Sequence, residues 1–279
     1  MTTNRNNLKD KIIEDLRKTG FLKELELARI LSDKGWRPHL NQTYLDKDIN
    51  TNREIDVVAS KKGRISNDKL HLWVNLVIEC KKTKNPWVII SNSDESSLNF
   101  HLQPGWSLIH GGEKYIDNGG IFPPRLIDKH LMRGASNRIG SAFHDSFKEP
   151  RETSKIFQSI MAACKAAVDK SEIHGASKEW EDYEKKDPTY LTFYHPIVVV
   201  DGPLYEAHLN DKNELTVDEV DWIPVTYNYS SRAYSEYGST SWHCDIVSFK
   251  FFEEYLMKAD NWLEKMNIDF VKWYNKKYT

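Results

Sequence analysis

Apolar and polar positions repeat along this chain with two different periods. Where apolar residues recur every three or four positions, as Leu8, Ile12 and Leu16 do, the pattern predicts a helix. The helical segments are residues 7–19, 21–31, 153–170 and 251–266, and an aromatic tail follows over residues 270–278. Small side chains along the third helix would let it pack closely against a sheet. The wide apolar stripe of the last helix is expected in a core rather than in an interface.

Short apolar runs bounded by turn residues predict strands between these helices. The predicted strands span residues 36–44, 54–59, 70–82, 195–202, 204–207, 222–229 and 245–249. A turn over residues 46–52 and a hairpin over residues 63–68 separate the first three strands. Because residues 70–82 are apolar on both sides, this segment is expected to be a central strand of a sheet.

The periodic pattern breaks down after Pro86. Residues 91–150 are rich in Ser, Asn, Gly and Pro, and this stretch is too long for an ordinary loop inside a compact domain. We therefore interpret residues 91–151 as an insertion that contains short helices. It divides one compact α/β domain into an N-terminal half, residues 1–90, and a remainder, residues 152–279.

Charged residues interrupt two of the predicted strands where apolar residues would be expected. Asp56 lies in the second strand, and Glu79 and Lys81 lie in the third. Because strand side chains alternate, Glu79 and Lys81 project to one side while Ile78 and Cys80 project to the other. Two converging carboxylates repel each other unless a cation lies between them, and oxygen ligands without His or Cys suit Mg²⁺ or Mn²⁺. A lysine beside such an ion could orient or deprotonate an attacking water, or hold a phosphate oxygen, as in phosphodiester hydrolysis.

These residues resemble the signature of the PD-(D/E)XK nuclease superfamily. That signature is an acid at the end of one strand, followed by Glu-x-Lys or Asp-x-Lys on the next strand. Asp56, Glu79 and Lys81 match it, and Ile55 stands where the family name has proline. The resemblance implies a restriction-endonuclease-like core, a central mixed β-sheet flanked by helices, with a long insertion and a C-terminal strand and helix extension. The alternative is a hairpin with a surface ion pair.

A further acid precedes these strands. The predicted apolar arc of the second helix consists of Phe21, Leu25, Ala28 and Leu31. Glu24 falls inside this arc, between Ala28 and Leu31, where a glutamate is costly unless it is paired or binds a cation. Many relatives of the superfamily carry a first-helix glutamate that completes the metal site, so the resemblance implies Glu24 as a third metal ligand. Glu26 faces away from the arc and is the second candidate. The alternative for Glu24 is an ion pair with a nearby basic residue.

Composition restricts the setting of this chemistry. The 279 residues carry a formal net charge of −2, which disfavours a tight nonspecific binder of nucleic acid. If the acids within residues 53–84 hold metal, the Lys and Arg residues there leave a positive surface suited to phosphate. Three widely separated cysteines suit a reducing cytoplasm and neither a disulfide framework nor zinc. Without a signal peptide or a long apolar run, a cytoplasmic protein with no membrane association is expected.

Other constellations are weaker. The histidines of the insertion, His101, His110, His130 and His144, lack metal-ligand spacing. His195 is expected to cap a strand, and the run from His243 to Asp245 is expected to pack beside a strand. Aromatic residues between Tyr227 and Trp242 either stack on unpaired bases or, as we favour, cover the end of a sheet.

The resemblance therefore implies a Mg²⁺- or Mn²⁺-dependent phosphodiesterase, in particular a DNA endonuclease of restriction or antiviral defence. Two alternatives stay open: a catalytically silent nuclease-like subunit that binds nucleic acid or serves in assembly, and a nuclease directed at RNA. The joint presence of Asp56, Glu79 and Lys81 weighs against the silent subunit. A homodimer and a regulatory or activating protein partner are also open.

Overall fold

The computed structural model describes residues 2–63, 70–92, 108–110, 138–148, 154–176, 189–228 and 241–278. Its helices are α1 (Thr2–Lys18), α2 (Phe21–Asp33), α6 (Lys155–Ala176) and α9 (Phe252–Tyr278), with a 3₁₀ turn, η1 (Phe249–Phe251), before the last. Its strands are β1 (Arg37–Asp46), β2 (Thr51–Lys62), β3 (Leu70–Lys82), β4 (Trp87–Asn92), β5 (Leu108–His110), β6 (Ile139–Asp145), β7 (Thr189–Asp201), β8 (Leu204–Leu209), β9 (Leu215–Glu219), β10 (Trp222–Asn228) and β11 (Ser241–Ser248).

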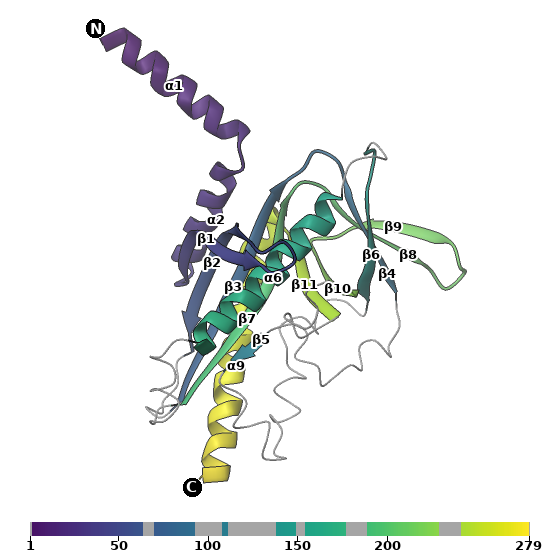
Figure 1. Ribbon diagram of the computed structural model, residues 1–279. Coiled ribbons are helices and arrows are strands. Elements are labelled where there is room, and N and C mark those ends of the chain that lie inside the picture. The colour runs from purple at the N-terminus through teal and green to yellow at the C-terminus, as the bar shows by residue number, and fades with distance from the viewer. Residues whose placement is uncertain are drawn as a thin grey trace.

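These elements form an α/β protein in which helices flank a large mixed β-sheet (Figure 1). Within the described residues the strand order is β1-β2-β3-β7-β11-β10-β6-β4-β8-β9, and β5 pairs with β7. The strands β1, β2 and β3 form an antiparallel meander, whereas β7 runs parallel to β3 along its full length. The helix α6 precedes β7, so the predicted order of helix, three strands, helix and strand is present, with β4, β5 and β6 inserted between β3 and α6. The central position predicted for β3 is confirmed.

Side chains of β3 alternate between two separate cores. Leu76 and Ile78 pack with α2 and α9 on one face of the sheet, whereas Val77 packs against Ala166 and Ala167 of α6 on the other. The two-residue period of an extended strand therefore decides which helix each side chain meets. The small residues of α6 let this helix approach the sheet closely, as predicted.

The last helix is a core element. Its apolar stripe is buried throughout: Phe252, Tyr255, Leu256, Ala259, Trp262, Leu263 and Met266. The core position predicted for this stripe is confirmed, and residues 270–278, predicted as a tail, continue the same helix. None of the helices within the described ranges is both long and apolar enough to cross a membrane.

The described parts of the insertion differ from the short helices that we predicted. They are strands of the same sheet: β4 reaches into it, β5 pairs with β7, and β6 pairs with both β4 and β10. The reason is tertiary, because β6 has little apolar alternation of its own. Its Gly140 lies so close to β4 that an added Cβ would be 2.3 Å from Ile89 Cγ2. The rest of this segment, and the hairpin tip at residues 64–69, lie outside the described residues.

Candidate active site

Asp56 lies at an irregularity in β2. Val57 packs on the face covered by α2 and α9, whereas Ile55 and Val58 both pack beneath α6. Residues three positions apart share a face only if the regular alternation slips between them. The β1–β2 ladder passes over Asp56, and the residue across from it, Asn41, has a left-handed φ of 50°. The strict alternation of strand side chains is therefore interrupted next to Asp56.

The main chain of the neighbouring strand holds the Asp56 carboxylate. The β2–β3 ladder ends at the pair of Val57 and Ile78, and beyond it the backbone N–H of Cys80 donates to Asp56 Oδ2 at 2.7 Å. The Asp56 carboxylate thus accepts a hydrogen bond that a backbone carbonyl of the neighbouring strand would otherwise accept. Burial raises the pKa of Asp56, although this hydrogen bond and the Lys81 ammonium oppose the rise.

Glu79 and Lys81 share one side of β3, as their spacing predicted. Lys81 Nζ lies 2.5 Å from Glu79 Oε1, and the Glu79 side chain is only 8% exposed. Its second oxygen, Oε2, is buried and has no hydrogen-bond partner among the described residues. Burial, and next the negative charge of Asp56, raise the pKa of Glu79 to about 7 despite the nearby Lys81. An unpaired buried carboxylate oxygen is costly, so the part of the chain that the structure describes does not by itself satisfy Glu79.

Lys81 is a cation in this environment. Its side chain is 37% exposed. Burial lowers its pKa, but the combined influence of Glu79 and Asp56 is greater and raises the pKa above its ordinary value. The ammonium form therefore dominates at neutral pH, and it can donate to a phosphate oxygen. In this state Lys81 is poorly suited to take a proton from water.

The buried face of α2 matches the predicted arc at Leu31 but not along its whole length. Leu27 and Leu31 are fully buried, whereas Phe21 and Leu25 are exposed, so the predicted arc was wrong at these positions. Apolar residues lie on two sides of this helix, and contact with β1 and β2 decides which side is covered. Glu24 precedes Leu27 by three residues and still lies toward the covered side.

Electrostatic coupling joins Glu24 to the strand acids. Burial and the charge of Asp56 raise the pKa of Glu24, while Lys81 lowers it. The adjacent Lys23 anchors this turn, since its Nζ lies 2.8 Å from Glu26 Oε2 and 3.8 Å from the carboxylate of Asp201 at the end of β7. Glu26 is thus engaged in an ion pair with Lys23, which favours Glu24 as the member of the site.

The Lys81 ammonium lowers the pKa of three carboxylates, those of Glu24, Asp56 and Glu79. If all are ionised, Glu24, Asp56 and Glu79 against Lys81 leave a formal charge of −2. No three His, Cys, Asp or Glu side chains in the described ranges lie close enough to hold a metal ion as they stand. Glu24 approaches from the α2 side of the sheet and Glu79 from the α6 side. The three-carboxylate metal site therefore stays a prediction, and Asp56 with Glu79 is the pair that fits a hard cation best.

Sequence reasoning missed the surroundings of Glu79 on the α6 side. Burial is the main cause that raises the pKa of Tyr44. The nearby charges of Asp46, Glu79 and Asp169 raise this pKa further, while Arg53 lowers it. Arg53 also lowers the pKa of Glu79. Arg53 lies three residues before Asp56, a spacing that faces opposite sides of a regular strand, so no local pattern could have placed Arg53 beside Glu79.

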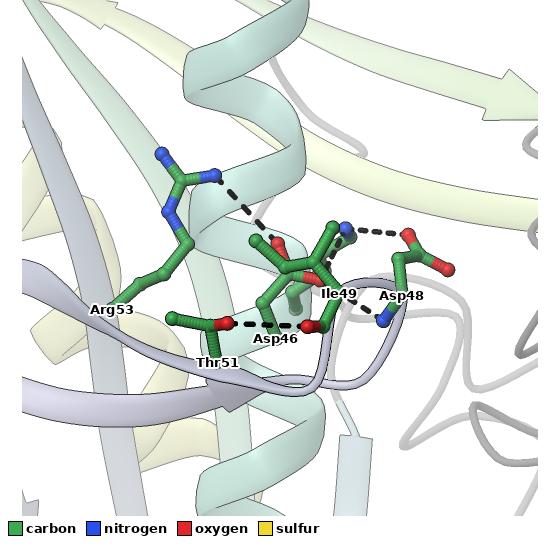
Figure 2. A network of polar contacts seen from close by, with 6 residues as sticks. Asp46, Asp48, Ile49, Thr51 and Arg53 are labelled. Carbon is green, nitrogen blue, oxygen red and sulfur yellow. Dashed lines mark hydrogen bonds and ion pairs between the residues drawn. The ribbon is translucent and has the colours of Figure 1, made fainter.

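A network of polar contacts supports this side of the site (Figure 2). Lys165 of α6 places its Nζ 2.7 Å from Asp46 Oδ1 and 2.5 Å from Asp48 Oδ2. The backbone N–H of Asp48 donates to Asp46 Oδ1 at 3.1 Å, and Arg53 Nη1 lies 3.6 Å from Asp46 Oδ2. Lys165 and Asp46 are 119 positions apart, so no local pattern pairs them.

The remaining histidine and aromatic predictions had mixed outcomes. His195 does not cap a strand: it lies within β7, and its Nε2 is 2.8 Å from Oδ2 of the buried Asp245 on β11. A cross-strand partner thus explains this residue. Cys244 is buried in strand packing, as predicted, and Tyr227 and Trp242 pack in the core beside α6. The other aromatic residues of that run, and His101 and His130, lie outside the described residues.

Comparison of the chain with protein-family models, with curated proteins and with solved structures gave no match. The resemblance to the PD-(D/E)XK superfamily therefore depends on the motif, on the order of the elements, and on the placement of Asp56, Glu79 and Lys81.

Proposed function

We propose that the protein is a divalent-metal-dependent nuclease with a restriction-endonuclease-like core, acting as a DNA endonuclease in restriction or antiviral defence. The proximity of Asp56, in the middle of β2, to Glu79 and Lys81, near the end of β3, carries the proposal. The antiparallel meander followed by α6 and the parallel strand β7 supports the fold assignment. The choice of DNA and of a defence role comes from the family resemblance alone.

Asp56 and Glu79, with Glu24 as a third ligand, are the residues that would hold Mg²⁺ or Mn²⁺. When bound, such an ion polarises a phosphoryl oxygen and lowers the pKa of water. The unpartnered Oε2 of Glu79 and the all-oxygen donor set fit a hard cation. Because a carboxylate ligand must be ionised, Glu79, with a pKa of about 7, is expected to couple metal affinity to pH.

The basic side chains have separate tasks in this proposal. Lys81 keeps its proton and donates to a non-bridging phosphate oxygen, where it stabilises the charge that develops during bond cleavage. Its ion pair with Glu79 orients the Nζ. Arg53 is more than half exposed and forms an ion pair with Asp46. Its planar guanidinium can donate to a second phosphate oxygen while this ion pair keeps the guanidinium in place.

The proposal is tested by incubating the purified protein with supercoiled plasmid, single-stranded DNA and RNA in Mg²⁺, Mn²⁺ or EDTA. We expect metal-dependent cleavage of DNA that is absent in EDTA and strongly reduced for Asp56→Asn and Glu79→Gln. The asparagine variant keeps an acceptor for the Cys80 N–H, and the glutamine variant keeps the side-chain shape. Cleavage of RNA alone would reassign the substrate, and nucleic-acid binding without cleavage in either metal would favour the silent subunit.

A further inference from the structure

The helix α1 projects away from the sheet and its flanking helices (Figure 1). Three of its apolar side chains, Leu8, Ile12 and Leu16, are 59%, 51% and 47% exposed. Spaced four residues apart, they form one stripe along the helix. An isolated helix of 17 residues is only marginally stable in water, because most helical stability in proteins comes from packing of an apolar face. The stripe therefore needs a covering surface.

The stripe is complementary to itself. It is symmetric about Ile12, so two antiparallel copies of α1 can place Ile12 opposite Ile12 of the partner subunit. Leu8 then meets Leu16 of the partner subunit, and the reverse contact forms by symmetry. The two-fold axis of such a pair lies perpendicular to both helices, so each flank of the stripe faces the same flank of the other copy.

Charges beside the stripe agree with this antiparallel arrangement. At 100° per residue, Lys11 and Asp15 fall on one flank of the stripe and Lys9 falls on the other. In the antiparallel pair, Lys11 lies beside Asp15 of the partner subunit, and this contact occurs twice. A parallel pair would instead bring the Lys11 flank against the flank that carries Lys9, and both opposite-charge contacts would be lost.

We infer that α1 is a self-association helix, which pairs antiparallel with α1 of a second copy of this chain through Leu8, Ile12 and Leu16. The inference is independent of the chemistry at Asp56 and Glu79, so its failure would leave the proposed nuclease function untouched. It differs from dimerisation through α9, whose apolar stripe is already buried in the core.

The first test is the mass of the full-length protein in solution, measured by sedimentation velocity over a range of concentrations. We expect a dimer for the wild type and a monomer for Ile12→Asp, because the substitution puts a carboxylate at the centre of the apolar contact. Thermal unfolding of the two proteins should coincide at concentrations where both are monomeric, since α1 is outside the core. A monomeric wild type at the highest soluble concentration, or an Ile12→Asp dimer of unchanged affinity, would overturn the inference.

The second test uses charge reversal at the flank. Lys11→Glu and Asp15→Lys should each weaken the dimer about tenfold, because each reverses two symmetric contacts worth up to about 0.7 kcal/mol apiece. An equimolar mixture of the two variants should regain dimerisation, since opposite charges then face each other again. Lys9→Glu is the matched control on the other flank and should leave the dimer intact. No recovery in the mixture, or an equal loss with Lys9→Glu, would refute the antiparallel pairing.

Discussion

Two clusters of carboxylates lie in the same part of the sheet, where Tyr44 is close to both Asp46 and Glu79, and they differ in how their charge is compensated. In the network of Figure 2, Asp46 and Asp48 share two cations, Lys165 and Arg53, and Asp46 also accepts a backbone N–H. At the candidate active site Lys81 forms an ion pair with Glu79 and lowers the pKa of both Asp56 and Glu24, whereas Arg53 acts on Glu79 only through its charge.

Burial alone therefore does not distinguish a structural cluster from a candidate metal site. Asp46 is 3% exposed on its side chain and Glu79 is 8% exposed, so both carboxylates have lost most of their water. Of these two carboxylates, Glu79 alone has a buried oxygen without a partner in the described residues, and its pKa rises to about 7. Because buried charges require opposite charges or metals, the uncompensated cluster is the one suited to a cation.

Exchanging carboxylate for amide should separate the two clusters most strongly. Glu79→Gln is expected to lose Mn²⁺ binding and to reduce cleavage by about a hundredfold to a thousandfold, because it removes a ligand charge. Its stability in metal-free buffer should be equal to that of the wild type or higher. Mn²⁺ titration calorimetry, a cleavage assay and urea unfolding measure these quantities. A large loss of stability would identify Glu79 as a structural acid.

The second prediction removes the cation, rather than a carboxylate, from the network of Figure 2. Lys165→Met leaves Asp46 and Asp48 without their buried cation, so we expect a loss of about 3 kcal/mol in the free energy of unfolding. Metal affinity should change little. Lys250→Met, which removes an exposed lysine from a surface pair, is the control and should be close to neutral. If Lys165→Met abolished metal binding instead, the two clusters would not be independent.

The two adjacent lysines of β3 sharpen the assignment of Lys81. Lys81→Ala should reduce the cleavage rate by roughly a hundredfold, because it removes a positive charge beside the scissile phosphate. Metal binding should persist, since lysine is not a ligand. Lys82 is exposed and lies on the other side of the strand, so the cleavage rate of Lys82→Ala should stay near that of the wild type. Equal losses in the two variants would disprove the argument from strand alternation.

The raised pKa of Glu79 predicts a pH dependence of stability in metal-free buffer. The ordinary pKa near 4.5 applies to the unfolded chain, and the folded value is about 7. Between these values the folded protein binds more protons, so stability should fall as pH rises from about 4.5 to 7 and level off above. The fall attributable to Glu79 is on the order of 3 kcal/mol. Urea unfolding in EDTA should show a smaller slope for Glu79→Gln, and parallel curves would contradict the assignment.

The smallest effect is expected on α2. Glu24→Gln should weaken Mn²⁺ binding by about tenfold, the lower end of the range for residues that support a metal site. Glu26→Gln is the matched control two residues away, and it should bind metal like the wild type because Glu26 pairs with Lys23. The same calorimetric titration compares them. Equal affinities for both variants would remove Glu24 from the site.

Local periodicity in the sequence determined much of this outcome. The bounds predicted for β3, Leu70 to Lys82, coincide with those in the structure. The shared side of Glu79 and Lys81 follows from the two-residue repeat of any extended backbone, so no tertiary information was needed. The helices were predicted for the same reason, because a 3.6-residue repeat is readable in one dimension.

Only the tertiary structure decided how these elements meet. The pairing of Asp46 with Lys165, the choice of Leu27 and Leu31 as the buried side of α2, and the slip at Asp56 depend on segments far apart in sequence. The sequence by itself therefore determined which residues share one side of a strand or helix. The fold decided which carboxylates lose their water and which receive a cation, because desolvation depends on the surrounding packing and not on the neighbouring residues in the chain.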